Sequence, residues 1–318
     1  MKILFITLSN IGDVILTLPV SSALKDSFQK EKIDVVVGPR AKEVFQKDPR
    51  VGNLFIYDKH ASLKEKIDFI KKLRKEKYDL AVDMRASLMP LLIGARRRTS
   101  LVLKDKSRPR HKRSVHLSKL KGLGIEYKKR QNVYIDTEDR DKVARLLGEH
   151  GIKKDDLLIG VSPTCRSLLK QWPSEGFIEV LKGFLQLGKY KVVLIGEDKK
   201  GHISKKITDA VNDKNLIDLT GKTNLNQLFA LIERMQVLLT CDSASLHIAC
   251  DLGVRTVAIF GPTDAKEYGP TGKDDIVIKK DLKCAPCRKA RCKLNQECMK
   301  EISPKEVLVA LKRLTLLR

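Results

Sequence analysis

The sequence is poor in aromatic residues, has far fewer acidic than basic residues, and has no long apolar run. Aromatic side chains make up 5% of its 318 residues and apolar residues as a whole 42%, which predicts globular cores of aliphatic side chains. No segment approaches the roughly 20 apolar residues of a membrane span. The first twenty residues have the apolar character of a signal peptide, but Ser9, Asn10 and Asp13 interrupt them and no small-residue cleavage pattern follows. We therefore expect a cytosolic protein.

The excess of basic over acidic residues gives a net charge of +24, from 63 Lys and Arg against 39 Asp and Glu. Residues 96–130 hold fourteen of the basic residues and only two acids. Such a segment attracts nucleic acid, an anionic membrane surface or a phosphorylated substrate, and the alternative is a solvated basic face. Tyr127 is its only aromatic residue and no known nucleic-acid-binding motif is present, so we expect no nucleic-acid partner.

Four of the seven cysteines follow the spacing C-x2-C-x4-C-x5-C within fifteen residues, at Cys284, Cys287, Cys292 and Cys298. In a cytosolic chain this spacing favours a structural zinc or iron site over a disulfide framework. Only the first pair has a common zinc-ligand spacing, so a reduced loop without metal is the alternative. The other three cysteines lie among apolar residues and are predicted to be core thiols.

Short aliphatic runs alternate with helical patterns in both halves of the chain, which predicts α/β domains with parallel sheets. The boundary is expected near Gly151–Asp156, giving domains of residues 1–152 and 153–318, with a cysteine-rich loop at 283–299 in the second. The predicted strands are 35–38, 54–57, 80–83 and 101–103 after the first run, and then 157–161, 191–195, 216–219, 237–240 and 255–260.

Asp13 is the first candidate functional residue. It follows the apolar run at 2–8 and comes just before helical spacing begins at Val14. Open α/β sheets bind ligands at this carboxyl edge of their strands. The alternative is that Asp13 only caps the helix, because Asp is a favoured N-cap residue.

Three loops in the second half also follow predicted strands, and together they indicate a diphosphate site. One loop ends in Lys170, one holds Glu197, and the third runs from Cys241 to His247. Free N–H groups at the start of a helix after Asp242, with serine hydroxyls beside them, suit a phosphate. Taken singly, Asp242 is equally suited to an N-cap and His247 to a half-buried histidine.

The combined motifs resemble family 9 glycosyltransferases, the ADP-heptose:lipopolysaccharide heptosyltransferases, and they run in family order as far as Thr263. The matching elements are Ile11-Gly12-Asp13-Val14, Lys170-Gln171-Trp172-Pro173, Leu219-Thr220-Gly221-Lys222-Thr223 and Asp242-Ser243-Ala244-Ser245-Leu246-His247. Ala244 departs from the family pattern, which usually has Gly there, and this leaves the donor sugar open.

The resemblance implies a GT-B fold, in which two Rossmann-like domains face each other across a cleft. The N-terminal domain would bind the acceptor and the C-terminal domain the nucleotide-sugar donor. It implies inverting transfer with Asp13 as general base and with no cofactor or divalent metal needed for catalysis. Glu197 would bind the ribose hydroxyls and Thr223 would lie beside adenine. The full implied donor site is Thr164, Lys170, Glu197, Thr223, Asp242, Ser243, Ala244 and His247.

The resemblance also implies the partners. These are ADP-heptose or a related nucleotide-sugar, a lipid A–core acceptor (Kdo-lipid A or heptosylated core), and the anionic inner face of the cytoplasmic membrane, where the enzyme would be peripheral. Arg108, Arg110, Lys112 and Arg113 are expected to face the acceptor and that membrane. The alternatives are a GT-B enzyme with another sugar or acceptor, an epimerase without an acceptor surface, or a nucleic-acid-binding protein.

Overall fold

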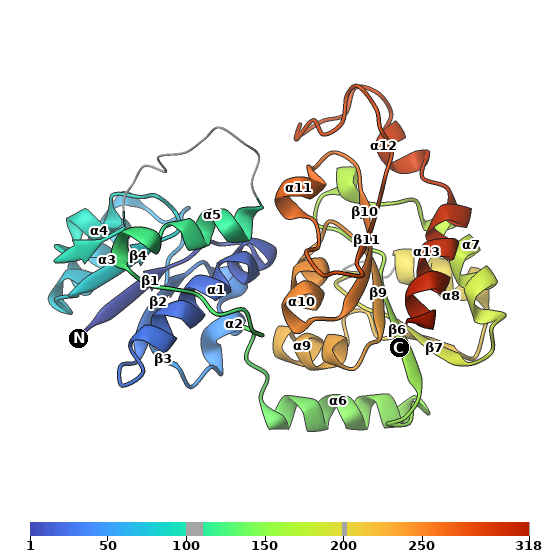
Figure 1. Ribbon diagram of the computed structural model, residues 1–318, viewed down its shortest axis with the longest axis horizontal. Coiled ribbons are helices and arrows are strands. Elements are labelled where there is room, and N and C mark those ends of the chain that lie inside the picture. The colour runs from blue at the N-terminus through green and yellow to red at the C-terminus, as the bar shows by residue number, and fades with distance from the viewer. Residues whose placement is uncertain (100–110, 199–201, 318) are drawn as a thin grey trace. The chain divides into compact units, whose positions relative to one another are not determined.

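The computed structural model describes residues 1–99, 111–198 and 202–317, and the chain forms two compact units, Met1–Tyr134 and Ile135–Arg318 (Figure 1). The division falls earlier than the predicted boundary because helix α6 (Thr137–Glu149) belongs to the second unit. It packs on α9 (Leu225–Glu233), and Arg140 donates two hydrogen bonds, of 2.7 and 2.9 Å, to the Glu233 carboxylate.

The first unit is built on a five-stranded parallel sheet with the order β3-β2-β1-β4-β5. Every residue of β1, β2 and β4 is buried, as expected for the short apolar runs of a sheet covered on both faces. The strand predicted at 101–103 lies outside the described residues. The strands are β1 (Ile3–Ile6), β2 (Ile33–Val37), β3 (Val51–Ile56), β4 (Leu80–Asp83) and β5 (Arg97–Arg98).

Helix α1 supplies much of the core of the first unit, since it is buried continuously from Val14 to Val20. Helix α3 is amphipathic and begins with a capping box between Ser62 and Glu65. The helices are α1 (Ile11–Ser27), α2 (Glu43–Gln46), α3 (Leu63–Lys75), α4 (Met89–Leu92) and α5 (Lys112–Ser118), with 3-10 turns η1 (Pro39–Ala41) and η2 (Lys121–Leu123).

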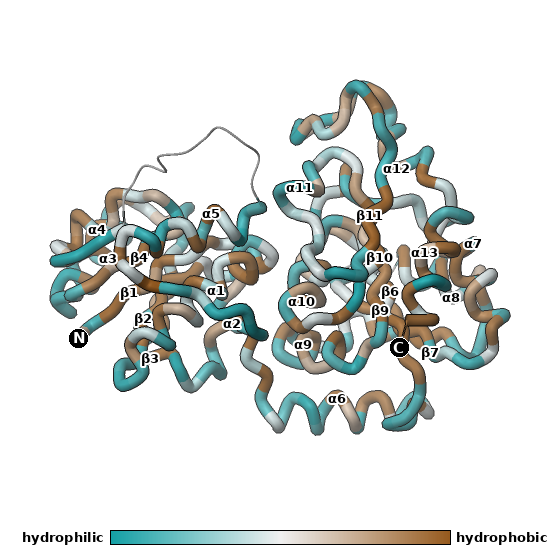
Figure 2. The backbone as a smooth tube through the Cα atoms, in the orientation of Figure 1, coloured by the Kyte–Doolittle hydropathy of each residue, from teal (hydrophilic) through white to brown (hydrophobic). Residues whose placement is uncertain are grey.

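The second unit has a six-stranded parallel sheet with the order β11-β10-β9-β6-β7-β8. Its edge strand β11 was not predicted. Figure 2 shows hydrophobic segments along the inner strands and a mixture of hydrophobic and hydrophilic residues along the helices. The strands are β6 (Leu157–Ser162), β7 (Tyr190–Leu194), β8 (Leu216–Asp218), β9 (Val237–Cys241), β10 (Arg255–Phe260) and β11 (Ile276–Lys279).

Trp172 belongs to a large hydrophobic core cluster of the second unit. Its ring packs on Phe177 with ring centroids 4.9 Å apart, and its indole N–H donates to the Ile302 carbonyl at 3.3 Å. A Cβ on Gly176 would lie 2.4 Å from the ring, so this position requires glycine. The remaining helices are α7 (Ser174–Leu185), α8 (His202–Val211), α10 (Ala244–Leu252), α11 (Ala265–Tyr268), α12 (Glu297–Lys300) and α13 (Pro304–Leu316), with the 3-10 turn η3 (Leu168–Lys170).

The strand orders fix where each unit can bind a ligand. In the first unit β2 and β3 extend the sheet on one side of β1, and β4 then pairs with the other side of β1. In the second unit β7 and β8 extend the sheet on one side of β6, and β9 then pairs with the other side of β6. The strand order therefore reverses between β1 and β4 and between β6 and β9. Loops at the carboxyl ends of strands flanking such a switch point form the ligand site of open α/β sheets. Asp13 follows β1, and Asp242 follows β9.

Among the described residues, no helix is both long enough and apolar enough to cross a membrane.

Candidate active site

The second unit brings side chains from three loops together around the Asp242 carboxylate. Lys170 Nζ lies 2.6 Å from Asp242 Oδ2, and Thr263 Oγ1 donates to the same oxygen at 2.7 Å. His247 Nε2 lies 3.8 Å from Oδ1. The Asp242 side chain is 5% exposed and that of Lys170 is 30% exposed. The buried carboxylate therefore holds an ammonium group that is partly accessible to solvent. Lys170, Asp242 and His247 are thus brought together as predicted, while Thr263 was not among the predicted site residues.

Asp242 is not a helix cap. Helix α10 begins at Ala244 and its N-cap is Ser243, so the N-cap interpretation of Asp242 is wrong. The Ser243 hydroxyl shares a hydrogen bond of 2.9 Å with Thr240 Oγ1 and does not cap the helix either. The first N–H groups of a helix have no partner within it. The start of α10 therefore offers backbone donors beside Lys170, and His247 lies one turn further on.

A second group of site residues surrounds Gly196, just after β7. Thr164 Oγ1 donates to the Glu197 carbonyl at 3.0 Å, which joins the loops after β6 and β7. Gly196 has a φ of 107°, and a Cβ there would lie 3.3 Å from both Ser162 Oγ and Thr164 Oγ1. Only glycine adopts this backbone at no steric cost. Glu197 itself is exposed.

Two hydrogen bonds connect these loops to the rest of the site. The Gly221 N–H donates to the Gly196 carbonyl at 2.9 Å, which ties in the turn that leads to Thr223. Ser162 Oγ donates to Ser245 Oγ at 3.2 Å and so joins the loop after β6 to helix α10. The predicted donor residues therefore lie on one connected set of loops at the carboxyl edge of this sheet.

Cys165 lies beneath the Lys170 loop and is not suited to nucleophilic chemistry. A hydrogen bond with Cys241, together with burial, holds the pKa of the Cys165 thiol well above its usual range. Its Sγ contacts the Lys170 carbonyl at 3.8 Å. Since the thiolate is the reactive form, this cysteine is a packing residue.

In the first unit, Asp13 is the third residue of α1. The helix begins at Ile11 with Asn10 as its N-cap, so Asp13 is not the cap. The Asn10 side-chain amide donates to Asp13 Oδ2 at 2.9 Å, and the carboxylate is only half-buried. A carboxylate in the first turn of a helix interacts favourably with the helix dipole. Asp13 is thus held by Asn10 at the carboxyl edge of the sheet, with its side chain partly exposed.

Arg85 was missed by sequence reasoning, although it follows β4 just as Asp13 follows β1. Its guanidinium donates to the Thr7 carbonyl at 2.5 Å and to Ser9 Oγ at 3.1 Å, and it lies over the Tyr57 ring at 5.1 Å. Burial lowers the pKa of Arg85, but an arginine remains charged at neutral pH. Arg85 therefore fixes the loop that carries Asp13 and places a positive charge at the same edge. The rule that pointed to Asp13, applied to the neighbouring strand, would have found it.

A family model described as glycosyltransferase family 9 (heptosyltransferase) matches residues 67–297. The chain belongs to this family. It is therefore a glycosyltransferase. Among similar proteins, lipopolysaccharide heptosyltransferase 3 of Escherichia coli is 27% identical, with 95% of this chain and 96% of that protein covered. Lipooligosaccharide heptosyltransferase 2 of Campylobacter jejuni is 24% identical, with 96% of each chain covered.

Solved structures give the fold of this family 9 enzyme. A family 9 glycosyltransferase from Veillonella parvula superposes with a TM-score of 0.87 at 24% identity, covering 100% of this chain and 98% of that one. The E. coli ADP-heptose lps heptosyltransferase II gives 0.75 at 22% identity, with 99% of each chain covered. With its two parallel-sheet units, the family 9 enzyme has the predicted GT-B fold.

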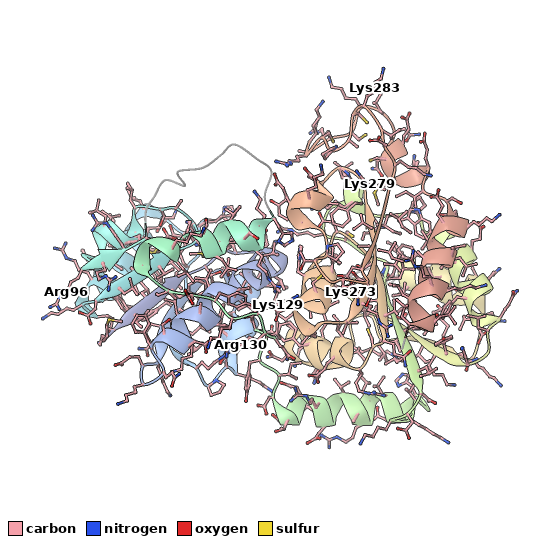
Figure 3. The ribbon with its side chains drawn as sticks, in the orientation of Figure 1. Arg96, Lys129, Arg130, Lys273, Lys279 and Lys283 are labelled. Atoms are coloured by element: carbon pink, nitrogen blue, oxygen red, sulfur yellow. The ribbon has the colours of Figure 1, made fainter. Side chains whose placement is uncertain are left out.

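The predicted basic surface of the family 9 enzyme is described only in part. Arg108 and Arg110 lie outside the described residues. Lys112 and Arg113 open helix α5, which packs against α1, the helix that carries Asp13. Elsewhere in the segment, Arg130 lies 3.0 Å from Asp26, so some of these charges have acidic partners (Figure 3).

The four clustered cysteines of the family 9 enzyme line one pocket, together with Leu169 and Pro262. Among the residues that the structure describes, no three histidine, cysteine or acidic side chains are arranged to hold a metal ion. Burial, together with the charge of the other three thiols, raises the pKa of Cys298.

Proposed function

We propose that this family 9 glycosyltransferase transfers heptose from ADP-heptose to the inner core of lipopolysaccharide, on Kdo-lipid A or heptosylated core, with inversion at the anomeric carbon. The observation that carries the proposal is the assembly of Lys170, Thr263 and His247 around Asp242 at the switch point of the second sheet. The similar proteins from E. coli and C. jejuni, named as heptosyltransferases of lipopolysaccharide and lipooligosaccharide, supply the substrate class.

The second unit is the proposed donor-binding domain. Lys170 has three N–H donors, and Asp242 accepts one of them, so the others are oriented for the diphosphate. The start of helix α10 adds backbone N–H groups and a favourable dipole for the same anion. Glu197 is proposed for the ribose hydroxyls and Thr223 for adenine. The remaining proposed contacts to the diphosphate and sugar are Thr164, Ser243, Ala244 and His247.

The proposed reaction is a single displacement. Asp13 accepts the proton of the acceptor hydroxyl while that oxygen forms a bond to the anomeric carbon. The bond from that carbon to the β-phosphate oxygen breaks, and ADP leaves with the electron pair. Lys170 and the α10 terminus stabilise the charge that develops on ADP. Because these groups neutralise the leaving group, the proposal needs no divalent metal at the reacting atoms.

The first unit is the proposed acceptor domain, and we propose that it docks on the anionic inner face of the cytoplasmic membrane. Leu88, Leu91 and Leu92, at and beside helix α4, are each more than half exposed. Arg96 follows within a few residues and is 82% exposed, although it lies 3.0 Å from Asp79 (Figure 3). Exposed leucines beside basic residues are the composition of a surface that binds an anionic bilayer.

Asp13→Asn tests the chemistry. The protein is incubated with ADP-heptose and truncated lipid A–core acceptors, and transfer is read as a mass increase of the acceptor. Loss of a general base typically costs roughly 10²–10⁴-fold in rate, whereas the affinity for donor should stay unchanged. Asp26→Asn, on the same helix, is the matched control. Activity of Asp13→Asn within about tenfold of the parent would remove Asp13 from this role. An altered nucleotide-sugar formed without acceptor would indicate an epimerase.

Liposome binding tests the membrane proposal. Neutralising Arg108, Arg110, Lys112 and Arg113 together should weaken binding to anionic vesicles, and the loss should shrink at high salt because exposed charges are screened. Equal binding of variant and parent at low salt would leave the segment a solvated basic face. Binding of oligonucleotides in place of vesicles would favour a nucleic-acid partner instead.

A further inference from the structure

The cysteine segment, residues 280–298, packs against the turn at residues 261–263, which completes the proposed donor site. It runs from the end of β11 into helix α12, and its tip projects beyond the sheet at Lys283 (Figures 1 and 3). The backbone N–H groups of Cys287 and Arg288 both donate to the Pro262 carbonyl, at 3.0 and 2.9 Å. Pro262 immediately precedes Thr263, whose hydroxyl binds Asp242. The segment thus binds the residue next to Thr263, which in turn binds the carboxylate of the proposed donor site.

Two further contacts fix the segment against this turn. Cys298 Sγ lies 3.0 Å from the place that a Cβ on Gly261 would occupy, so the cysteine packs directly on the residue before Pro262. The Arg288 guanidinium lies 2.7 Å from Oε1 of Glu267, which belongs to helix α11. The turn at 261–263 is therefore covered by the cysteine segment on its outer side.

The four thiols share one small space. They line a single pocket of about 230 Å³, and Leu169, next to Lys170, lines the same pocket. Cys292 Sγ also accepts two backbone N–H groups, from Leu294 at 3.4 Å and from Gln296 at 3.3 Å. Hydrogen bonds from surrounding groups orient the ligands of metal sites, and these two bonds orient the Cys292 sulfur.

The charge around the cysteines also suits a metal centre with four sulfur ligands. Four thiolates around a divalent ion leave a net negative centre, and nearby cations offset it. Basic residues are interleaved with the cysteines at Lys283, Arg288, Lys289, Arg291 and Lys293.

We infer that these four cysteines hold one divalent ion of the thiolate-preferring class, zinc or iron, and that the bound ion fixes the Gly261–Thr263 turn for donor binding. As placed, no three ligand side chains among the described residues are close enough to hold the ion, so binding draws the sulfurs together. Cys284 and Cys292 are exposed and lie where the chain forms no helix or strand, whereas Cys298 is buried in α12. The inward movement therefore falls on Cys284 and Cys292. Four protein ligands leave no open position, so the ion is structural.

Only the effect on donor binding rests on the proposed function; the metal site itself does not. Elemental analysis of protein purified under reducing conditions should find about one equivalent of zinc or iron per chain, and the element found identifies the ion. Substituting cobalt should give the strong visible absorption of a tetrahedral thiolate site. Metal-free protein with four titrating thiols in this segment, or with disulfides between them, would overturn the inference.

The variant Cys287→Ser/Cys292→Ser tests the coupling, with Cys250→Ser as a control outside the segment. We expect the double variant to lose the metal, melt at a lower temperature and bind ADP several-fold more weakly, while the control keeps all three properties. If the double variant does not fold, the parent stripped of metal by a chelator takes its place. Metal loss with unchanged ADP affinity would overturn the coupling alone. A parent that holds metal but binds no ADP would instead refute the proposed donor site.

Discussion

Lys170→Met is the most informative single change, because it removes one charge and keeps most of the side-chain length. In the folded enzyme the Lys170 ammonium lies 2.6 Å from Asp242 Oδ2, and Asp242 is almost fully buried. The substitution therefore has two separable consequences. It removes a cation from the proposed diphosphate site, and it leaves a buried carboxylate with fewer partners.

Both consequences can be given a size. Breaking a fully buried ion pair costs about 3–5 kcal/mol. Here Lys170 is 30% exposed and Thr263 still donates to Asp242, so we expect a loss of about 1–3 kcal/mol in the free energy of unfolding. A hydrogen bond to a charged group contributes about 1.5–3 kcal/mol, so the dissociation constant for ADP should rise about ten- to a hundredfold.

Calorimetry with ADP and denaturant unfolding measure the two effects, and Lys182→Met, on the exposed side of helix α7, is the control. Adding Asp242→Asn removes the buried charge. The double variant should therefore lose less stability than the sum of the single changes. Unchanged ADP affinity in folded Lys170→Met would show that Lys170 does not contact the diphosphate. Strict additivity would show that the pair is not coupled.

Three further predictions concern single positions. Gly196→Ala should cost about 1–3 kcal/mol of stability and weaken donor binding, because its φ is 107°; an unchanged denaturation midpoint would contradict this. Arg85→Ala should lower transfer with donor affinity unchanged, since it loosens the Asp13 loop, and weakened ADP binding would refute this account. Burial, with Lys119 and Lys112 nearby, lowers the pKa of His116 to about 4, so between about pH 6.5 and 4 the unfolded chain binds a proton that the folded chain does not. Stability should fall as the pH drops through that window, by at most about 3 kcal/mol, and His116→Phe should flatten the fall in unfolding experiments.

The sequence allowed the central parts of both sheets to be predicted because their strands are continuous apolar runs. The edge strands β5 and β11 were not predicted, because β5 consists of two exposed arginines and β11 is only partly buried. Such strands are defined by their neighbours rather than by their own composition. The division between the two compact units, after Tyr134, could not be read from the sequence for a similar reason. The amphipathic pattern of helix α6 would suit packing on either domain. Only its contacts with α9 and the ion pair between Arg140 and Glu233 assign it to the second unit.

The candidate site was predictable to the extent that its residues follow strands. Lys170, Asp242 and His247 lie where the motif order implies, and the structure joins them. Neighbour relations across the sheet could not be read from one sequence, so the roles of Thr263 and Arg85 were missed. Each of the two binds a part of the chain that is distant in sequence. Thr263 donates to Asp242, and Arg85 donates to the Thr7–Ser9 loop.

The role of Asp242 follows from its charge. An ionised carboxylate only accepts hydrogen bonds and repels phosphate, so Asp242 cannot itself bind the diphosphate. Its oxygens instead hold Lys170 and Thr263 at 2.6 and 2.7 Å, in a place where water is largely excluded. Lysine has a long side chain with much rotamer freedom, and a fixed partner removes part of the entropy that binding would otherwise cost. Asp242 is therefore a positioning residue. Since the cysteine segment contacts the turn that carries Thr263, we propose that it acts on donor binding through this same carboxylate.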